Sequence, residues 1–221
     1  MVYDPLSLDL RSLFHTSDMF DSPSDWRHEG FKIIRDSEKK LVVAKHKAAD
    51  GYLFKKYMNH MSSKEQLERY TRRIEGARKL ETLFSEIGAQ HLVVPKKWMY
   101  ELPFSQRSPS HLVIVQEFQV FDDRRDGDNE SEYRHHHITL DVLRELTVVW
   151  FRCKGLDFTA MNAPFTKRGQ IAFIDTGYVA WQERGDLSKV KSEYMKNADR
   201  YLSGSRLRFA KDRWRELSDN R

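Results

Sequence analysis

Three polar side chains in the second half of the chain are of types that could handle a phosphate group. Asp157 and Asn162 lie five residues apart in a segment with turn residues and no helical apolar period, and Asp175 follows a short apolar run. That run, residues 171–174, indicates a strand, and residues 167–169 before it indicate a hairpin turn. Such a hairpin would bring Asn162 and Asp175 close together, with Asp157 on the same loop. The oxygen atoms of these side chains could bind a hard cation such as Mg²⁺. One carboxylate could also accept the proton of an attacking hydroxyl group.

The order of these residues resembles the catalytic loop and metal loop of the protein kinase-like fold, in which H-R-D-L-x-x-x-N is followed later by D-F-G. The resemblance implies that Asp157 is the catalytic Asp and that Asn162 and Asp175 bind the metal. The sequence differs from that of a standard protein kinase at two places. Residues 155–156 are Gly-Leu in place of His-Arg, and Thr176 replaces the Phe. The chain is therefore similar to atypical and small-molecule kinases, including the compact kinases that some bacteria use as effectors. Without the resemblance, the same residues describe a polar β-hairpin with acidic side chains at the surface.

The size and composition fit one compact domain or two small lobes. A chain of 221 residues can fold without disulfides or a structural metal, and the single cysteine, Cys153, is expected to be a buried small side chain and not a nucleophile. No apolar run approaches the length of a membrane span, and the first residues do not form a secretion signal. We therefore expect a protein of the cytoplasm, or of a host cytoplasm if the chain is an effector.

Three short β-type segments begin the part of the chain that the resemblance assigns to the N-lobe. Residues 31–34, 41–44 and 52–57 are separated by turn residues and predict three antiparallel strands. Residues 1–29 are expected to be a leader that packs on the outside of the fold. The turn between the first two strands contains no glycine, so the G-x-G-x-x-G phosphate cover of the family is absent.

A kinase-like site needs a lysine on the third strand to hold the phosphates. Lys55 and Lys56 both qualify by position, and strand alternation puts them on opposite faces of the sheet. We predict Lys55, because Leu53 on the same face is a plausible wall for the adenine. Lys56 would share its face with the larger Phe54.

A long helical pattern follows, which begins at Ser62 with a capping box and ends at Gly88. The resemblance gives this helix the place of the kinase αC helix, which offers a Glu to the strand lysine. At about 100° per residue, Glu81 lies inside the apolar stripe and Glu75 almost opposite it. Glu81 is therefore expected to face the core and to pair with Lys55, although Glu75 fits the usual spacing better.

The apolar segment at residues 112–121 predicts the buried strand that leaves the N-lobe. In the family the end of this strand is a hinge that binds adenine through backbone groups, which the resemblance places at Glu117, Phe118 and Gln119, with Gln116 as the gatekeeper. Backbone recognition leaves little trace in side chains. An ordinary central strand explains the same apolar residues equally well.

The remaining segments predict a minimal C-lobe. Residues 139–154 indicate a buried helix that leads to the catalytic loop, and only 44 residues follow Gly177, in two further helices, the second of them basic. Three consecutive histidines at 135–137 are not expected to bind zinc, since neighbouring residues of regular structure cannot all face one ion. The basic helix is expected to be a solvated face.

Together these features predict an α+β protein with a two-lobed protein kinase-like fold. The predicted parts are a leader (residues 1–29), a small antiparallel-sheet N-lobe (30–119) and a truncated, mostly helical C-lobe (120–221). The expected function is transfer of phosphate from ATP, with Mg²⁺, to a hydroxyl group, with a nucleotide and a protein acceptor as partners. A pseudokinase that serves as a nucleotide- or protein-binding module is the alternative. A basic nucleic-acid binder is a third hypothesis, suggested by the net charge of +5 but not by any recognised motif.

Overall fold

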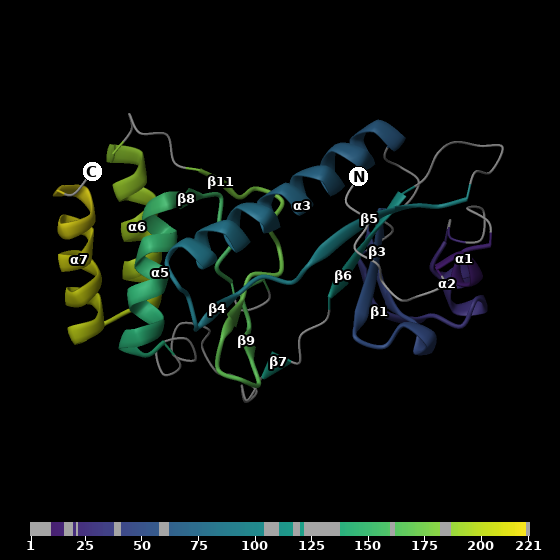
Figure 1. Cartoon of the computed structure of the whole chain (residues 1–221), viewed down its shortest axis with the longest axis horizontal. Helices are drawn as coiled ribbons and strands as arrows, with labels where there is room; N and C mark the ends of the chain where they lie inside the picture. Colours follow the sequence, from purple (N-terminus) through teal and green to yellow (C-terminus); the bar gives the residue numbers. More distant parts are fainter. Residues whose placement is uncertain are drawn as a thin grey trace. The chain divides into compact units, whose positions relative to one another are not determined.

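The protein is an α+β structure with a small antiparallel sheet and several helices (Figure 1). The computed structural model describes residues 10–15, 20, 22–37, 41–57, 62–103, 111–116, 120–121, 138–159, 162–181 and 187–219. The chain divides into two compact units. The first unit comprises Met1–Ile74 and Pro95–Phe118, and the second comprises Glu75–Val94 and Gln119–Arg221. The leader thus belongs to the same unit as the first sheet, and residues 75–94 belong with the C-terminal part.

The first unit contains a five-stranded antiparallel sheet in the order β1-β2-β3-β6-β5. Its strands are β1 (Lys32–Ser37), β2 (Leu41–Lys45), β3 (Tyr52–Tyr57), β5 (Lys97–Glu101) and β6 (His111–Gln116), and a short 3-10 helix, η2 (Lys47–Ala49), joins β2 to β3. The three antiparallel strands predicted at the start of this region are confirmed. Residues 38–40 of the turn without glycine lie outside the described residues.

The leader forms part of the core of the first unit. It contains α1 (Leu10–Leu13) and α2 (Pro23–His28), and α2 begins with a capping box in which the backbone N–H of Asp25 donates to Ser22 Oγ at 3.3 Å and that of Ser22 to Asp25 Oδ2 at 2.7 Å. Its aromatic side chains pack with apolar side chains of β2, β3 and β6 in one cluster. Three of them are completely buried: Phe14, Phe20 and Trp26. The described part of the leader therefore contributes to the core of the first unit, whereas the sequence predicted that it packs on the outside of the fold.

The opposite face of the sheet packs against the first half of α3 (Ser63–Glu86). The backbone N–H of Tyr57 at the end of β3 donates to the hydroxyl oxygen of Tyr70 at 2.7 Å, and the two rings stack with their centroids 5.4 Å apart. Tyr70 is 1% exposed, and burial raises the pKa of its hydroxyl group. This contact fixes the face of the sheet on which Leu53 and Lys55 lie, because residues 53, 55 and 57 alternate to the same side.

The second unit contains two small sheets. One has the order β4-β10-β9-β7 and the other pairs β11 with β8. Their strands, each of two residues, are β4 (Leu92–Val93), β7 (Val120–Phe121), β8 (Cys153–Lys154), β9 (Phe165–Thr166), β10 (Ile171–Ala172) and β11 (Ala180–Trp181). The hairpin predicted before Asp175 is confirmed as β9 and β10, which pair in antiparallel fashion. The single strand predicted at 112–121 is instead two strands, β6 and β7, with residues 117–119 between them outside the described residues.

Three helices pack against one another in the second unit (Figure 1). They are α5 (Leu140–Arg152), α6 (Leu187–Tyr201) and α7 (Gly204–Asp219). The predicted buried helix before the catalytic loop is α5, and its N-cap is Thr139, whose Oγ1 accepts from the N–H of Val142 at 3.3 Å. Cys153 follows α5 and is 1% exposed, and burial raises the pKa of its thiol to about 12. It is a buried small side chain, as expected.

Three basic residues of the terminal helix form ion pairs. In α7, Arg213 Nη1 lies 2.5 Å from Glu216 Oε2 and Arg215 Nη1 lies 2.7 Å from Asp212 Oδ1, while Lys211 Nζ is 3.5 Å from Asp199 of α6. Most of these side chains are exposed, so the pairs contribute little to stability. The pairs offset part of the positive charge, which fits a solvated face. Throughout the described part of the chain, no helix has the length and apolar character that crossing a membrane requires.

Candidate functional site

Asp157 and Asn162, predicted to work together, are joined by a hydrogen bond in the second unit. Asn162 Nδ2 donates to Asp157 Oδ2 at 2.5 Å, and the backbone N–H of Thr159 donates to Asp157 Oδ1 at 3.2 Å. The N–H of Asn162 donates to the carbonyl oxygen of Thr159 at 3.0 Å, which brings these two residues of the loop together. Asp157 is exposed and Asn162 is half-buried. The carboxylate is thus fixed in orientation and still open to solvent.

Asp175 lies beside this turn because the β9–β10 hairpin returns the chain to it. The N–H of Ile174 donates to the carbonyl oxygen of Asn162 at 2.8 Å. Asp175 is the next residue after Ile174 and therefore lies close to the loop. The hairpin turns at Gly169, whose φ of +75° suits glycine. The N–H of Gly177 donates to Asp175 Oδ1 at 3.1 Å and orients the carboxylate. The structure therefore brings together the three segments that carry Asp157, Asn162 and Asp175.

Gly155, two residues before Asp157, has a backbone conformation and surroundings that require glycine. Its φ is +71°, and a Cβ atom built on it would lie 2.1 Å from the carbonyl oxygen of Tyr178, directly after the Asp-x-Gly triplet. Its N–H donates to Glu193 Oε1 of α6 at 3.0 Å. No side chain fits at this position unless Tyr178 moves. Sequence reasoning missed Glu193, which looks like any other acid on an amphipathic helix.

Gly76 was also missed, and it brings α3 directly against the Asp-x-Gly triplet. A Cβ atom on Gly76 would lie 1.9 Å from the carbonyl oxygen of Thr176, which is completely buried. Glycine in a helix interior is less favourable than alanine by about 1 kcal/mol. That unfavourable choice, in the middle of a long helical pattern, was the signal in the sequence that could have identified Gly76 as a site of close packing.

We expect Gly76→Ala to destabilise the protein, although helix propensity alone predicts the opposite. The added methyl group would overlap a backbone oxygen, and such overpacking costs about 1–3 kcal/mol, which exceeds the propensity gain of about 1 kcal/mol. Urea unfolding of the two proteins, followed by circular dichroism, measures the sign. A variant more stable than the wild type would show that α3 does not lie against Thr176.

The first unit places the predicted lysine on the helix-covered face of the sheet. Lys55 and Leu53 are half-buried on the side of Tyr70, whereas Lys56 is completely buried on the other side, the side of Phe54. The expectation that the two lysines occupy opposite faces is met. Lys55 on the helix side remains our prediction for the phosphate ligand, and Leu53 for the adenine wall.

The prediction that Glu81 faces the core is wrong, because both Glu81 and Glu75 are exposed on α3. The buried side of this helix changes along its length, since the first half packs on the sheet of the first unit and the second half in the core of the second unit. Glu81 lies on the side that is buried only in the first half. Its proposed pairing with Lys55 stays a prediction without the support of burial.

Several other predicted residues fall where the structure is not described. The hinge residues Glu117, Phe118 and Gln119 and the histidines at 135–137 lie outside the described residues. The gatekeeper Gln116 is half-buried at the end of β6. Among the residues that the structure does describe, no three His, Cys, Asp or Glu side chains are grouped so that they could hold a metal ion.

The side chains of Asn162 and Asp175 nevertheless fit Mg²⁺. Because Asn162 Nδ2 donates to Asp157, the amide oxygen is the atom that Asn162 can offer to a cation. Asp175 supplies a carboxylate that the N–H of Gly177 already orients. Mg²⁺ prefers oxygen ligands, keeps several waters and is usually held by one or two carboxylates together with substrate phosphates. A cage of three acidic side chains is therefore not required.

Comparison with known proteins gave matches among solved structures only. No family model matches the chain, and no curated protein sequence does. A crystal structure of WbdD has a TM-score of 0.43 and 14% identity, over 74% of this chain and 36% of that one. A second structure, of WbdD as a bifunctional kinase-methyltransferase, has a TM-score of 0.41 and 14% identity, with 71% and 33% covered. A complex of WbdD with the kinase inhibitor LY294002 has a TM-score of 0.41 and 12% identity, with 76% and 37% covered. The chain spans roughly a third of the length of these proteins.

Proposed function

We propose that the protein transfers the terminal phosphoryl group of ATP, in the presence of Mg²⁺, to a hydroxyl group of an acceptor. The observation that supports this most is the hydrogen-bonded pair of Asp157 and Asn162, held next to Asp175 by the β9–β10 hairpin. Side chains of these types, at this spacing and in this order, suit the positioning and charge stabilisation that phosphoryl transfer needs.

Asp157 would accept the proton of the acceptor hydroxyl group. Of the residues that the structure describes, Thr159 donates to one of its carboxylate oxygens and Asn162 to the other, and a carboxylate can accept about four hydrogen bonds. Its exposure leaves room for an acceptor to approach. The two existing bonds hold the carboxylate in one orientation, which is the condition for efficient proton transfer.

Asn162 and Asp175 would hold Mg²⁺, which when bound would neutralise charge on the phosphates. The hydrogen bond from Asn162 to Asp157 links the cation ligand to the proton acceptor. A substitution that removes this hydrogen bond therefore alters the orientation of the remaining side chain. The acceptor is expected to be a protein, and Lys55 and Leu53 of the first unit are the candidates for contacts with the nucleotide.

We expect Mg·ATP to raise the melting temperature of the wild-type protein, and Asp175→Ala to remove the part of the shift that depends on Mg²⁺. Ligand at 100 times its dissociation constant stabilises the native state by about 2.7 kcal/mol. Differential scanning fluorimetry with ATP, in Mg²⁺ or in EDTA, measures both shifts, and production of ADP measures turnover.

Asp199→Ala is the matched control, since it removes an exposed acid of α6 whose side chain pairs with Lys211 at 3.5 Å. The control should keep the full shift. An Mg²⁺-dependent shift that survives in Asp175→Ala would remove Asp175 from the site. A wild-type protein with neither shift nor turnover would overturn the proposed function.

A nucleotide-binding pseudokinase is the second candidate, favoured by the exposure of both Glu81 and Glu75. Neither carboxylate has the burial expected for a partner of the strand lysine. A pseudokinase would bind Mg·ATP and give the thermal shift without forming ADP. Measuring both properties on one sample separates the two candidates.

A further inference from the structure

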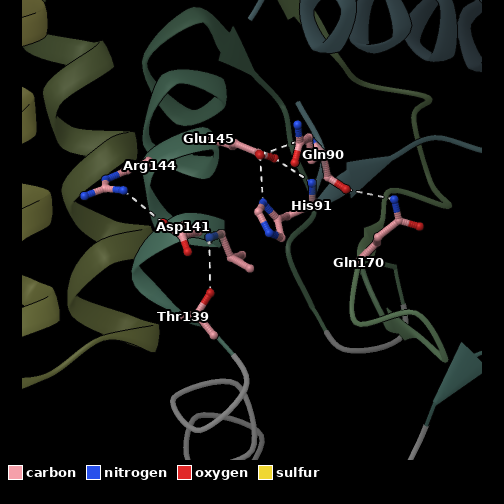
Figure 2. Close-up of polar contacts among 8 residues, drawn as sticks. Gln90, His91, Thr139, Asp141, Arg144, Glu145 and Gln170 are labelled. Carbon is pink, nitrogen blue, oxygen red and sulfur yellow. Dashed lines mark hydrogen bonds and ion pairs between the residues drawn. The ribbon is translucent and has the colours of Figure 1, made fainter. Parts of the chain in front are cut away.

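In the second unit, the carboxylate of Glu145 on α5 binds the residues just before β4 (Figure 2). Glu145 Oε1 accepts from the backbone N–H of Gln90 at 2.9 Å, and Oε2 accepts from the backbone N–H of His91 at 2.9 Å. The Nδ1 atom of His91 lies 2.8 Å from Oε1. The Glu145 side chain is only 15% exposed. One carboxylate therefore satisfies two backbone donors and one side chain at the point where the chain enters β4.

Hydrogen bonds continue from this point toward Asp175. The carbonyl oxygen of His91 accepts from the N–H of Ile171 at 2.8 Å, and β4 pairs with β10 in parallel fashion. Gln170 Nε2 donates to the carbonyl oxygen of Gln90 at 2.9 Å (Figure 2). The N–H of Phe173 then donates to the carbonyl oxygen of Val93 at 2.9 Å. Just beyond β10, the N–H of Ile174 donates to the carbonyl oxygen of Asn162.

The strands β4 and β10 are too short for their pairing alone to fix their positions. β4 and β10 have two residues each, and so short a pair has little stability of its own. Glu145 provides the external anchor, because it projects from a helix of 13 residues whose apolar side is buried. Other charged side chains of α5 do not share this role: Asp141 and Arg144 pair with each other at 2.9 Å and are exposed (Figure 2).

We infer that Glu145 is a positioning residue, which sets Asp175 against Asn162 by fixing β4 and, through β4, β10. The inference rests on the proposed function, since it assigns Glu145 to the geometry of the Mg²⁺ ligands. Glu145 itself touches neither the nucleotide nor the cation. Loss of its carboxylate leaves two backbone donors without their acceptor and removes this polar link between α5 and the residues just before β4.

The test compares Glu145→Ala and Glu145→Gln with Glu86→Ala in the full-length chain. Glu86 is a suitable control because it is also a helical carboxylate of the second unit, in an exposed ion pair with Arg152 at 2.7 Å. We expect Glu145→Ala to raise the Mg²⁺ concentration for half-maximal ADP formation about tenfold, as loss of a residue that orients metal ligands does. The rate at saturating Mg²⁺ should fall much less. Glu145→Gln keeps one acceptor oxygen and should lie between Glu145→Ala and the wild type.

A second readout does not depend on activity. Hydrogen exchange at the amides of Ile171 and Phe173 should be faster in Glu145→Ala than in Glu86→Ala, and the core of α5 and α6 should keep its protection. A lower rate at every Mg²⁺ concentration, or uniformly faster exchange, would mean that Glu145 only stabilises the fold, and would overturn the inference. If Glu145→Ala does not fold, Glu145→Gln decides by the same two measurements. Wild-type protein without any turnover would overturn the proposed function and, with it, the catalytic part of this inference.

Discussion

Asp157→Asn is expected to lower the rate of phosphoryl transfer by about 10²- to 10⁴-fold, which is the range for loss of a general base. Asparagine has nearly the same shape, and its oxygen can still accept the hydrogen bond from Asn162 Nδ2. The loop should therefore keep its conformation. Affinity for Mg·ATP should remain close to that of the wild type, because Asp157 would meet the acceptor and not the triphosphate. Single-turnover rates and nucleotide titrations measure the two quantities separately.

Asn162→Ala is the contrasting variant, since it removes a proposed Mg²⁺ ligand together with the hydrogen bond to Asp157. Its activity should depend more steeply on Mg²⁺ and recover in part when Mg²⁺ is raised. Asp157→Asn should not recover in this way. The same Mg²⁺ dependence in both variants, or loss of nucleotide binding in Asp157→Asn, would show that the two roles have been assigned wrongly.

The segment that carries the candidate site could be predicted from the sequence because its determinants are local. The turn at residues 167–169, the short apolar run after it and the spacing from Asp157 to Asn162 lie within 20 residues of one another. Such patterns specify a hairpin and a loop without reference to the rest of the chain. The helix α5, with its Thr139 cap and apolar stripe, is equally local.

The packing of α3 could not be predicted in the same way. The apolar period predicts one continuous stripe that includes Glu81, whereas the buried side changes between the halves of the helix. Which side is buried depends on contacts with strands and helices distant in the sequence. The same holds for Glu145 and Glu193: each binds backbone amides of a distant segment, and nothing in their own helices distinguishes them from solvated acids.

A comparison of Gly155 with Gly169 distinguishes two reasons for which a position requires glycine. One is an unfavourable backbone conformation, and the other is a lack of space for a side chain. Gly155 and Gly169 both have positive φ, +71° and +75°. A Cβ atom on Gly169 would meet no heavy atom within 4 Å, whereas a Cβ atom on Gly155 would lie 2.1 Å from the backbone oxygen of Tyr178. Alanine at either position requires the left-handed conformation, which costs an L-residue about 1–2 kcal/mol. Only at position 155 does a steric overlap add to that cost.

We expect Gly155→Ala to be the more damaging variant by about 1–3 kcal/mol, the usual cost of overpacking against atoms that cannot move easily. Because Tyr178 directly follows the Asp-x-Gly triplet, relief of the overlap would displace either that triplet or the start of the Asp157 loop. Gly155→Ala should thus lose both stability and turnover, while Gly169→Ala should lose a smaller amount of stability and keep its turnover. Urea unfolding and ADP production measured on both variants provide the comparison. Equal losses of stability would mean that Gly155 is present for its φ angle alone and that the loop before Asp157 does not lie against Tyr178.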